Sequence, residues 1–363
     1  MKSPFELIGF DHVRCVVGNA KQATHYYQSV FGFELVAFSG LETGNRENVS
    51  YVLRQDKTVF VLDSPLGANS WMNDELRQHG DGVKDIAFEV DDAAAAWKHT
   101  TSKGAKSAME PKTIEDDNGK VALSAIHTYG DTIHTFVERQ NYKGTFLPGY
   151  EPAQSWIDVK PVGLHCIDHI VGNQPDGEME QVATFYEDVF GFHRLWTVDD
   201  KDISTNHTAL RSIVVESENT RVKMPINEPA EGLKKSQIQE YIDFYAGAGV
   251  QHVALSTHDA ISTVQKLVDN GCDFLYVPDD YYDTLTDRVG EVDEDISALR
   301  KLGILVDRDE DGYLLQLFTK PVQDRPTLFY EVIQRKGAKS FGKGNFKALF
   351  EAIEREQERR GTL

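Results

Sequence analysis

The pattern of apolar and polar positions repeats about halfway along the chain. Residues 10–13 (FDHV) precede residues 26–33 (YYQSVFGF), and the same order returns as residues 167–170 (IDHI) and 185–192 (FYEDVFGF). Self-similarity of this kind is typical of a fold built from repeated supersecondary units. We therefore expect two similar halves.

Each half contains a second strand that is followed by a helix. Residues 82–88 (GVKDIAF) pair with residues 249–255 (GVQHVAL), and each run precedes another helical stretch. Within a unit, an apolar strand precedes an amphipathic helix closed by a glycine such as Gly32, and alternating strand-like runs follow. Such a βαβββ unit is too small to bury its own sheet face, so two units must pair. The expected fold is α+β, with four βαβββ units in two half-domains of curved, barrel-like mixed sheets, closed by a C-terminal helix.

A segment rich in proline and glycine separates the halves. Residues 147–161 contain Pro148, Gly149, Pro152 and Pro161, which favour turns over regular elements. We place the boundary near residue 155. Residues 1–155 are expected to form a structural domain without an intact metal site, and residues 156–363 a catalytic domain.

Composition and charge narrow the classes of function. The 363 residues are 40% hydrophobic and 26% charged, as in ordinary globular proteins, and no apolar run is long enough for a membrane span. The formal net charge of −20 opposes binding to nucleic acid. Three scattered cysteines and an N-terminus without an apolar leader predict a reducing, cytoplasmic compartment.

Three residues in strand-like runs of the second half form a candidate metal site, namely His169, His252 and Glu331. Glu331 lies in the apolar run 328–333 (LFYEVI), where a buried carboxylate is costly unless a cation or another strong partner compensates its charge. Two imidazoles and one carboxylate on one face of a metal leave three positions for substrate and O₂, as Fe(II) oxygenases require. We expect one Fe(II) per chain.

The repeat distinguishes the three proposed ligands from the residues at the equivalent positions of the first half. His12 stands at the position of His169, but Asp85 stands where the second half has His252, so the first half lacks the same ligands. The other histidines considered in the second half are interpreted as structural or surface residues, namely His165, His193, His207 and His258. Of these, His165 is expected to precede the strand that carries His169. The alternative is that the three proposed ligands are unrelated core or edge residues.

Three stretches carry a resemblance to a known family. They are residues 309–331, which begin DEDGYLLQLFTKP, residues 225–238, which begin PINEPA, and residues 341–346 (FGKGNF). Together they resemble the 4-hydroxyphenylpyruvate dioxygenase family of the vicinal oxygen chelate superfamily, over nearly the whole chain. The resemblance implies that 4-hydroxyphenylpyruvate and O₂ are converted to homogentisate and CO₂ in tyrosine catabolism.

The resemblance also implies a substrate pocket. The aromatic ring is expected between Phe318 and Phe346, and the other expected pocket residues are Ser212, Asn227, Gln237 and Gln251 for the phenol oxygen, with Pro225, Phe329, Phe341 and Asn345 around them. Gln251 adjoins His252, so it faces the site only if a bulge or twist intervenes. Gln316 shares a strand face with Phe318 and is expected to orient the keto acid or Glu331, the alternative being a satisfied core amide.

The closing helix has two interpretations. Its apolar positions Phe346, Leu349, Phe350 and Ile353 follow helical spacing, which fits a lid over the site and equally fits a helix packed on a core. Asn345 is alternatively the N-cap of this helix.

Rival functions share parts of this pattern. 4-Hydroxymandelate synthase would use the same fold, metal and substrate but hydroxylate the benzylic carbon. A metal-free binding protein would lack the triad, and a glyoxalase-type lyase would use Zn²⁺ or Ni²⁺. A homodimer or homotetramer is expected, with Trp71, Tyr142 and Phe146 as exposed aromatic residues at a candidate interface.

Overall fold

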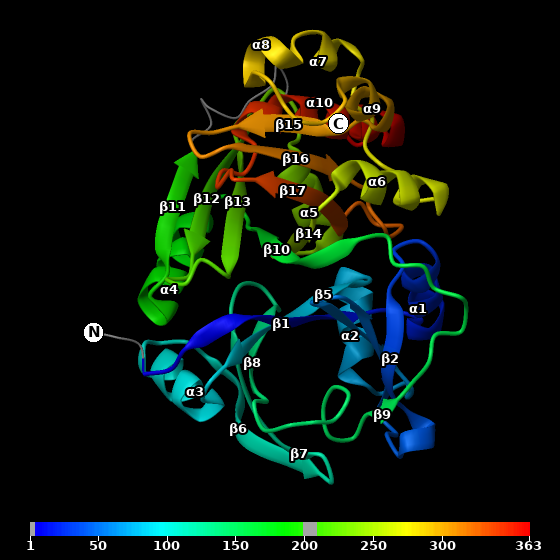
Figure 1. The fold of residues 1–363 in the computed structure, drawn as a ribbon. Helices are drawn as coiled ribbons and strands as arrows, with labels where there is room; N and C mark the ends of the chain where they lie inside the picture. Colours follow the sequence, from blue (N-terminus) through cyan, green and yellow to red (C-terminus); the bar gives the residue numbers. More distant parts are fainter. Residues whose placement is uncertain (1–3, 199–208) are drawn as a thin grey trace.

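Two halves, each built on one curved mixed sheet, lie against each other in the computed structural model, which describes residues 4–198 and 209–363 (Figure 1). The first half forms a nine-stranded sheet with the order β6-β7-β8-β5-β1-β4-β3-β2-β9. Its elements are β1 (Leu7–Val16), α1 (Ala20–Ser29), β2 (Glu34–Ser39), η1 (Leu41–Thr43), β3 (Asn48–Gln55), β4 (Thr58–Pro65), α2 (Trp71–His79), β5 (Gly82–Val90), α3 (Ala93–Ser102), β6 (Ser107–Asp116), β7 (Gly119–His127), β8 (Ile133–Glu138) and β9 (Glu151–Pro152).

The second half forms an eight-stranded sheet with the order β11-β12-β13-β10-β14-β17-β16-β15. Its elements are β10 (Leu164–Asn173), α4 (Met179–Phe190), β11 (His193–Val198), β12 (Ala209–Glu216), β13 (Lys223–Ala230), α5 (Gln237–Tyr245), β14 (Gly249–Thr257), α6 (Ala260–Asp269), α7 (Asp280–Asp283), α8 (Leu285–Val289), α9 (Ile296–Leu302), β15 (Leu305–Arg308), β16 (Tyr313–Phe318), β17 (Phe329–Lys336), η2 (Lys343–Asn345) and α10 (Phe346–Arg360). No helix among the described residues has both the length and the apolarity needed to cross a bilayer.

The two sheets have the same topology. In each, the first strands of two βαβββ units pair antiparallel at the centre, β1 with β5 and β10 with β14. Each of these strands also pairs in parallel with the last strand of its own unit. The expected fold class is confirmed, and α7, α8 and α9 are an insertion in the fourth unit that the repeat did not predict.

The connection between the halves runs along the first sheet. β9 pairs with β2, and β10 begins at Leu164, so the expected boundary near residue 155 lies between two strands of different sheets. The prediction that His165 precedes its strand was wrong, because β10 begins one residue earlier. The His165 ring instead contacts Asp56 of the first half, with 2.6 Å between Nδ1 and Oδ2.

The halves meet through matched aromatic residues. Tyr27 of α1 and Tyr330 of β17 have hydroxyl oxygens 2.6 Å apart. Their repeat counterparts, Tyr186 of α4 and His134 of β8, have the Tyr186 hydroxyl oxygen 2.7 Å from His134 Nε2. All four side chains are buried, and one continuous apolar core includes residues of both halves. The two sheets therefore form one packed body.

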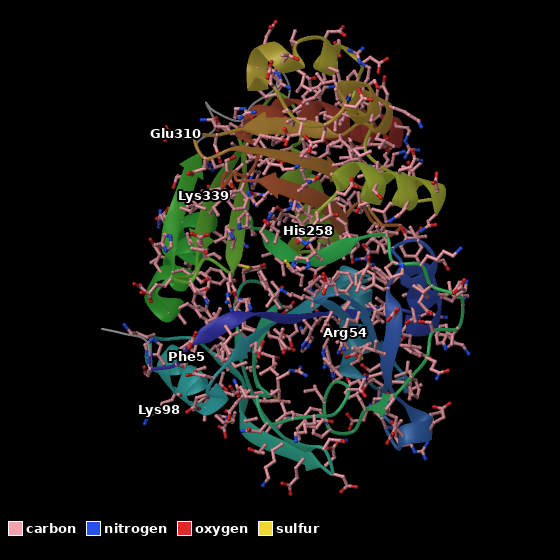
Figure 2. The ribbon with its side chains drawn as sticks, in the orientation of Figure 1. Phe5, Arg54, Lys98, His258, Glu310 and Lys339 are labelled. Atoms are coloured by element: carbon pink, nitrogen blue, oxygen red, sulfur yellow. The ribbon has the colours of Figure 1, made fainter. Side chains whose placement is uncertain are left out.

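The concave side of the first sheet is filled by its own chain. The segment between β8 and β9 runs inside the curve of the sheet (Figure 1). Its residues Phe146 and Leu147 pack against apolar residues of the sheet. The expectation that Phe146 is exposed was wrong: it is 2% exposed, because the sheet curves around it. Trp71 is 53% exposed, as expected. Figure 2 shows the side chains of both halves, with Phe5, Arg54 and Lys98 on the first and Glu310 and Lys339 on the second.

Candidate metal centre

Three neighbouring strands, β10, β14 and β17, bring the predicted ligands together. Ala254 of β14 pairs with His169 of β10 on one side and with Glu331 of β17 on the other. His252 lies two residues before Ala254, so strand alternation places its side chain on the same face. The small Ala254 side chain leaves the space between the three ligands open.

The three ligand atoms converge on one point. Glu331 Oε2 lies 3.1 Å from His169 Nε2 and 3.3 Å from His252 Nε2. Ligands on one face of an octahedral ion, each about 2.1 Å from the metal, lie about 3 Å from one another, so this spacing fits a divalent cation. Among the residues that the structure describes, this is the single group of three potential ligands within 4.8 Å of one another.

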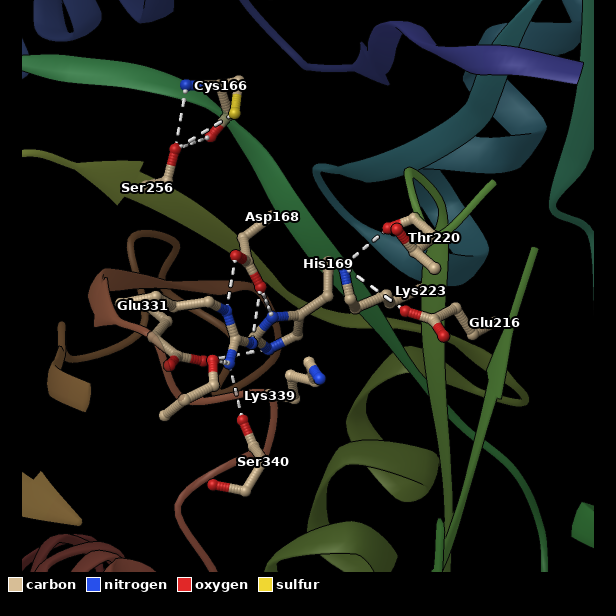
Figure 3. Close-up of polar contacts among 12 residues, drawn as sticks. Cys166, Asp168, His169, Glu216, Thr220, Lys223, Ser256, Glu331, Lys339 and Ser340 are labelled. Atoms are coloured by element: carbon tan, nitrogen blue, oxygen red, sulfur yellow. Dashed lines mark hydrogen bonds and ion pairs between the residues drawn. The ribbon is translucent and has the colours of Figure 1, made fainter. Parts of the chain in front are cut away.

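The other nitrogen of each imidazole is fixed by its preceding residue. His169 Nδ1 donates to Asp168 Oδ1 at 2.8 Å, and Figure 3 shows this carboxylate beside the imidazole. His252 Nδ1 donates to Gln251 Oε1 at 2.9 Å. With an acceptor beside each Nδ1, both rings are oriented so that Nε2 faces the centre, as a metal site needs.

The charge of Glu331 is secured by its neighbours. Burial raises the pKa of Glu331, but the charge of His169 and hydrogen bonds from both histidines outweigh it and lower this pKa to about 2. Burial also lowers the pKa of His252, which therefore stays neutral more readily than a free histidine. The pKa of His169 is raised, since Glu331 and Asp168 outweigh the effect of burial. Two nitrogen donors and a carboxylate of this kind suit Fe(II) and other divalent ions.

Two β-bulges make the consecutive contacts possible. In the pairing of β10 with β14, the register shifts between Ile167 and His169 and again opposite Gln251. Asp168 and Gln251 are the extra residues at these shifts, so each can turn toward the histidine that follows it. Gln251 thus faces the site because of a β-bulge, the kind of distortion expected to be necessary for a residue next to His252.

A largely apolar cavity opens from the three ligands. Ser212 of β12 pairs with Asn227 of β13, and both face the cavity with Gln237 and Gln251. The other lining residues are Val171, Leu210, Val214, Pro225, Phe318, Phe329, Phe341, Phe346, Leu349 and Phe350. Phe329 stacks on His252 with ring centroids 4.8 Å apart, and Phe318 meets the same ring edge-on at 5.9 Å. The cavity therefore has a metal end and an amide-rich wall within apolar surroundings, as small-molecule sites commonly do.

Helix α10 covers this cavity. Phe350 packs against Leu210 and Ile238, while Phe346 and Leu349 face the interior. At the end of the helix, Arg360 donates to both carboxylate oxygens of Glu240, at 2.8 and 3.1 Å. The helix thus closes the site and is itself packed, so the two interpretations of its apolar face are compatible.

Comparisons with known proteins agree with this geometry. Residues 1–149 match the family described as "Hydroxyphenylpyruvate dioxygenase, HPPD, N-terminal", and residues 166–317 match the "Glyoxalase/Bleomycin resistance protein/Dioxygenase superfamily". A 4-hydroxyphenylpyruvate dioxygenase of Dictyostelium discoideum is 51% identical, over 98% of this chain and 100% of its own. Another, of Danio rerio, is 52% identical over 99% of this chain and 93% of its own. The chain belongs to the 4-hydroxyphenylpyruvate dioxygenase family.

A solved structure extends the comparison to a related enzyme. A triple-substitution variant of 4-hydroxymandelate synthase from Streptomyces coelicolor superposes with a TM-score of 0.86 and 30% identity, covering 97% of this chain and 99% of that one. Identity to the 4-hydroxyphenylpyruvate dioxygenases is much higher, so the family assignment does not change.

Two pocket residues expected in this member of the dioxygenase family lie behind the cavity wall. Gln316 is 1% exposed, and its amide packs under Gly342, where an added Cβ would lie 2.4 Å from Gln316 Oε1. Asn345 precedes α10 as expected for an N-cap, but its side chain does not cap the helix. Its Oδ1 instead accepts a hydrogen bond from the Tyr281 hydroxyl at 2.6 Å.

The remaining histidines lie apart from the ligands. His193 is paired with Glu216, and the rings of His165 and His258 are 4.6 Å apart. His207 lies outside the described residues. Asp168 and Arg335, which contact one another beside His169, were missed, although the doublet Asp-His at 11–12 and 168–169 was visible in the repeat.

The first half has a different arrangement at the corresponding place. Asp85, the counterpart of His252, accepts hydrogen bonds from the backbone and hydroxyl of Thr135, the counterpart of Glu331. His12 Nε2 is buried and has no hydrogen-bond partner among the described residues. The carboxylate there is used for hydrogen bonding within the sheet.

Proposed function

We propose that this chain is an Fe(II)-dependent dioxygenase that converts 4-hydroxyphenylpyruvate and O₂ to homogentisate and CO₂ in tyrosine catabolism. The observation that carries the proposal is the convergence of His169, His252 and Glu331 in the lining of a largely apolar cavity. His169, His252 and Glu331 would hold Fe(II), which would leave three positions for a chelating α-keto acid and for O₂ and would supply the oxidation chemistry. The protein would orient the substrate, provide polar contacts for its keto acid and phenol ends, and exclude water from the site.

The keto acid end of the substrate belongs beside the ligands. Phe318 and Phe329 pack against the His252 ring, and the substrate ring is proposed to lie between Phe318 and Phe346, which both line the cavity. Both polar atoms of the Gln316 amide are buried without a partner among the described residues. Such an amide costs free energy unless it is used, so Gln316 is assigned to orient Glu331 or the keto acid from behind the cavity wall.

The phenol oxygen is assigned to the polar side chains of the cavity wall. Ser212 and Asn227 lie side by side on adjacent strands, and Gln237 begins α5 facing the same cavity. Gln251 accepts from His252 through its oxygen and retains an amide nitrogen that can donate to the phenol. A substrate without the phenol would leave these groups unpaired, which is a source of selectivity.

Apolar contacts complete the pocket and keep water out. Phe346 of α10 lines the cavity together with Pro225 and Phe341. Exclusion of water protects an oxidising reaction from wasteful turnover. The closing helix is accordingly assigned as the lid.

The first half is proposed to be structural, with residues 1–155 as its domain and residues 156–363 as the catalytic domain. A homodimer or homotetramer is proposed, with Trp71 as an exposed aromatic contact. The three cysteines are free thiols, which supports a cytoplasmic location.

The test is product analysis with metal-loaded protein. Fe(II)-reconstituted enzyme is mixed with 4-hydroxyphenylpyruvate in air, O₂ uptake is recorded, and homogentisate is separated from 4-hydroxymandelate by chromatography. His252→Ala should abolish turnover, whereas His258→Ala, which removes an exposed histidine on the same half, should not (Figure 2). Homogentisate supports the proposal, and the absence of O₂ uptake by folded, iron-loaded protein contradicts it.

The second candidate function is that of 4-hydroxymandelate synthase. It is favoured by the similarity to the solved synthase variant, whose fold matches over 97% of this chain. 4-Hydroxymandelate as the product would retain the metal site and reassign the residues that hold the ring.

A further inference from the structure

The carboxylate that holds ligand His169 is itself held by an arginine. Arg335 of β17 donates from Nε to Asp168 Oδ2 and from Nη2 to Asp168 Oδ1, both at 2.8 Å. Asp168 Oδ1 also accepts the Nδ1–H of His169. The Asp168 and Arg335 side chains are only 11% and 18% exposed, so this two-pronged pair is largely shielded from water.

The same arginine also binds the segment that leads into the lid. Arg335 Nη1 donates to the backbone oxygens of Ala338 and Ser340, at 3.2 and 2.6 Å. Its guanidinium lies over the Phe341 ring, 5.3 Å from the ring centroid. The Phe341 ring in turn meets His169 edge-on at 5.0 Å. One side chain therefore touches both the support of a metal ligand and the backbone just before η2 and α10.

The first half repeats this arrangement where no metal triad exists among the described residues. Arg139 donates to both oxygens of Asp11 at 2.7 Å, and Asp11 accepts from His12 Nδ1 at 2.6 Å. The Arg139 guanidinium lies 5.2 Å from the Phe146 ring centroid, and Phe146 meets His12 edge-on at 5.2 Å. This arrangement of aspartate, histidine, arginine and phenylalanine therefore belongs to the repeated fold. Only the copy in the second half contacts a proposed metal ligand and the segment that leads into α10.

We propose that Asp168 and Arg335 form a positioning unit that fixes the His169 imidazole toward the metal and fastens the Phe341 segment, so that metal binding and the seating of α10 are coupled. The inference rests on the proposed metal site. Arg335 is a positioning residue, since it acts through Asp168 and through the backbone of residues 338–340. Its planar fork can make all these bonds at once, whereas lysine or glutamine cannot.

The test measures metal affinity and backbone protection without relying on turnover. Co(II), which can replace Fe(II) without oxidising in air, is titrated into the full-length protein and followed by its visible absorption. Amide hydrogen exchange of residues 337–350 is measured with and without Co(II). In the wild type, Co(II) should slow exchange in this segment. Arg335→Gln should weaken Co(II) binding by about tenfold to a hundredfold and remove most of that protection.

The repeat offers a matched control. Arg139→Gln deletes the same set of bonds in the half without the triad, so exchange should rise near residues 140–150 while Co(II) affinity stays as in the wild type. Asp168→Asn, which keeps an acceptor for His169 but sets an amide against the guanidinium, should reproduce the Arg335→Gln result. Arg335→Lys, which keeps the charge, serves if Arg335→Gln fails to fold.

The outcomes are distinct. Wild-type Co(II) affinity in the Arg335 variants, or an equal loss in Arg139→Gln, would overturn the proposed coupling while leaving the metal site in place. Weakened Co(II) binding with unchanged protection would also overturn it, because the link to the lid would be missing. A wild-type protein that binds no Co(II) would overturn the proposed function itself.

Discussion

The two imidazoles of the candidate metal centre are held by chemically different neighbours. His169 donates to a carboxylate, Asp168, whereas His252 donates to an amide oxygen, that of Gln251. A carboxylate partner makes an imidazole a stronger donor to a metal than an amide does. The two histidine ligands are therefore not equivalent, and substitutions of their partners should have separable effects.

Gln251→Leu should weaken metal binding by about tenfold, because the buried Nδ1–H of His252 loses its acceptor and the ring loses its orientation. Gln237→Leu should instead raise KM for the keto acid with unchanged metal affinity, since Gln237 lines the cavity from α5, a helix that carries none of the three ligands. Co(II) titration and steady-state kinetics of both variants separate the two roles. Equal metal affinity in Gln251→Leu and wild type would contradict the assignment of Gln251.

At the scale of elements, the sequence predicted strands and repeats better than local distortions. The triad was predictable because His169, His252 and Glu331 stand in repeat-equivalent apolar runs, and apolar alternation is a property of each run alone. The bulges at Asp168 and Gln251 depend on the register between two strands, which no single run encodes.

The insertion α7 to α9 was missed for a related reason. Its helices are short and are held by tertiary contacts, such as the hydrogen bond from the Tyr282 hydroxyl to the Ile304 oxygen at 3.1 Å. Short helices of this kind have little stability of their own, so their sequences carry a weak helical pattern. Gln316 was expected in the cavity from its strand face, but the backbone of Gly342 covers it.

Helix α10 carries no metal ligand, so its packing can be weakened separately. Phe350→Ala removes the ring that packs on Leu210 and Ile238, which should favour local opening of the helix by a few kcal/mol at most. We expect faster amide exchange in residues 346–360 and a lower kcat/KM, with unchanged metal affinity. Lys347→Ala is the control, because this side chain on the same helix is 76% exposed. Weaker metal binding in Phe350→Ala alone would contradict the separation.

At the scale of the whole molecule, the duplicated sheets should hold a single ion. The first half has His12 but uses Asp85 to bind Thr135, and no second group of three ligands occurs among the described residues. Metal analysis of reconstituted protein should give one Fe(II) per chain. His12→Gln should leave this value unchanged, and His252→Gln should reduce it to near zero. Two ions per chain in the wild type would contradict the prediction.

The seam between the halves should make stability depend on pH. Burial lowers the pKa of His134 from 6.5 to about 4, so the unfolded chain binds a proton that the folded chain does not. The folded state should therefore lose about 3 kcal/mol from this group as the pH falls from about 6.5 to 4. Urea unfolding of the wild type and of His134→Gln at several pH values measures this loss, since the variant cannot take up the proton. Parallel pH curves would exclude the effect.

The paired aromatic contacts across the seam make each half part of the other's buried surface. Tyr330 is followed directly by ligand Glu331, and its hydroxyl is matched by Tyr27 of the other half. A minimal enzyme cut down to the second half would present Tyr330, Tyr186 and their buried apolar neighbours to water, on the outer side of the strands that hold the metal. The first half thus shields these residues from water, and engineering toward a smaller catalyst would first have to redesign the surface it covers.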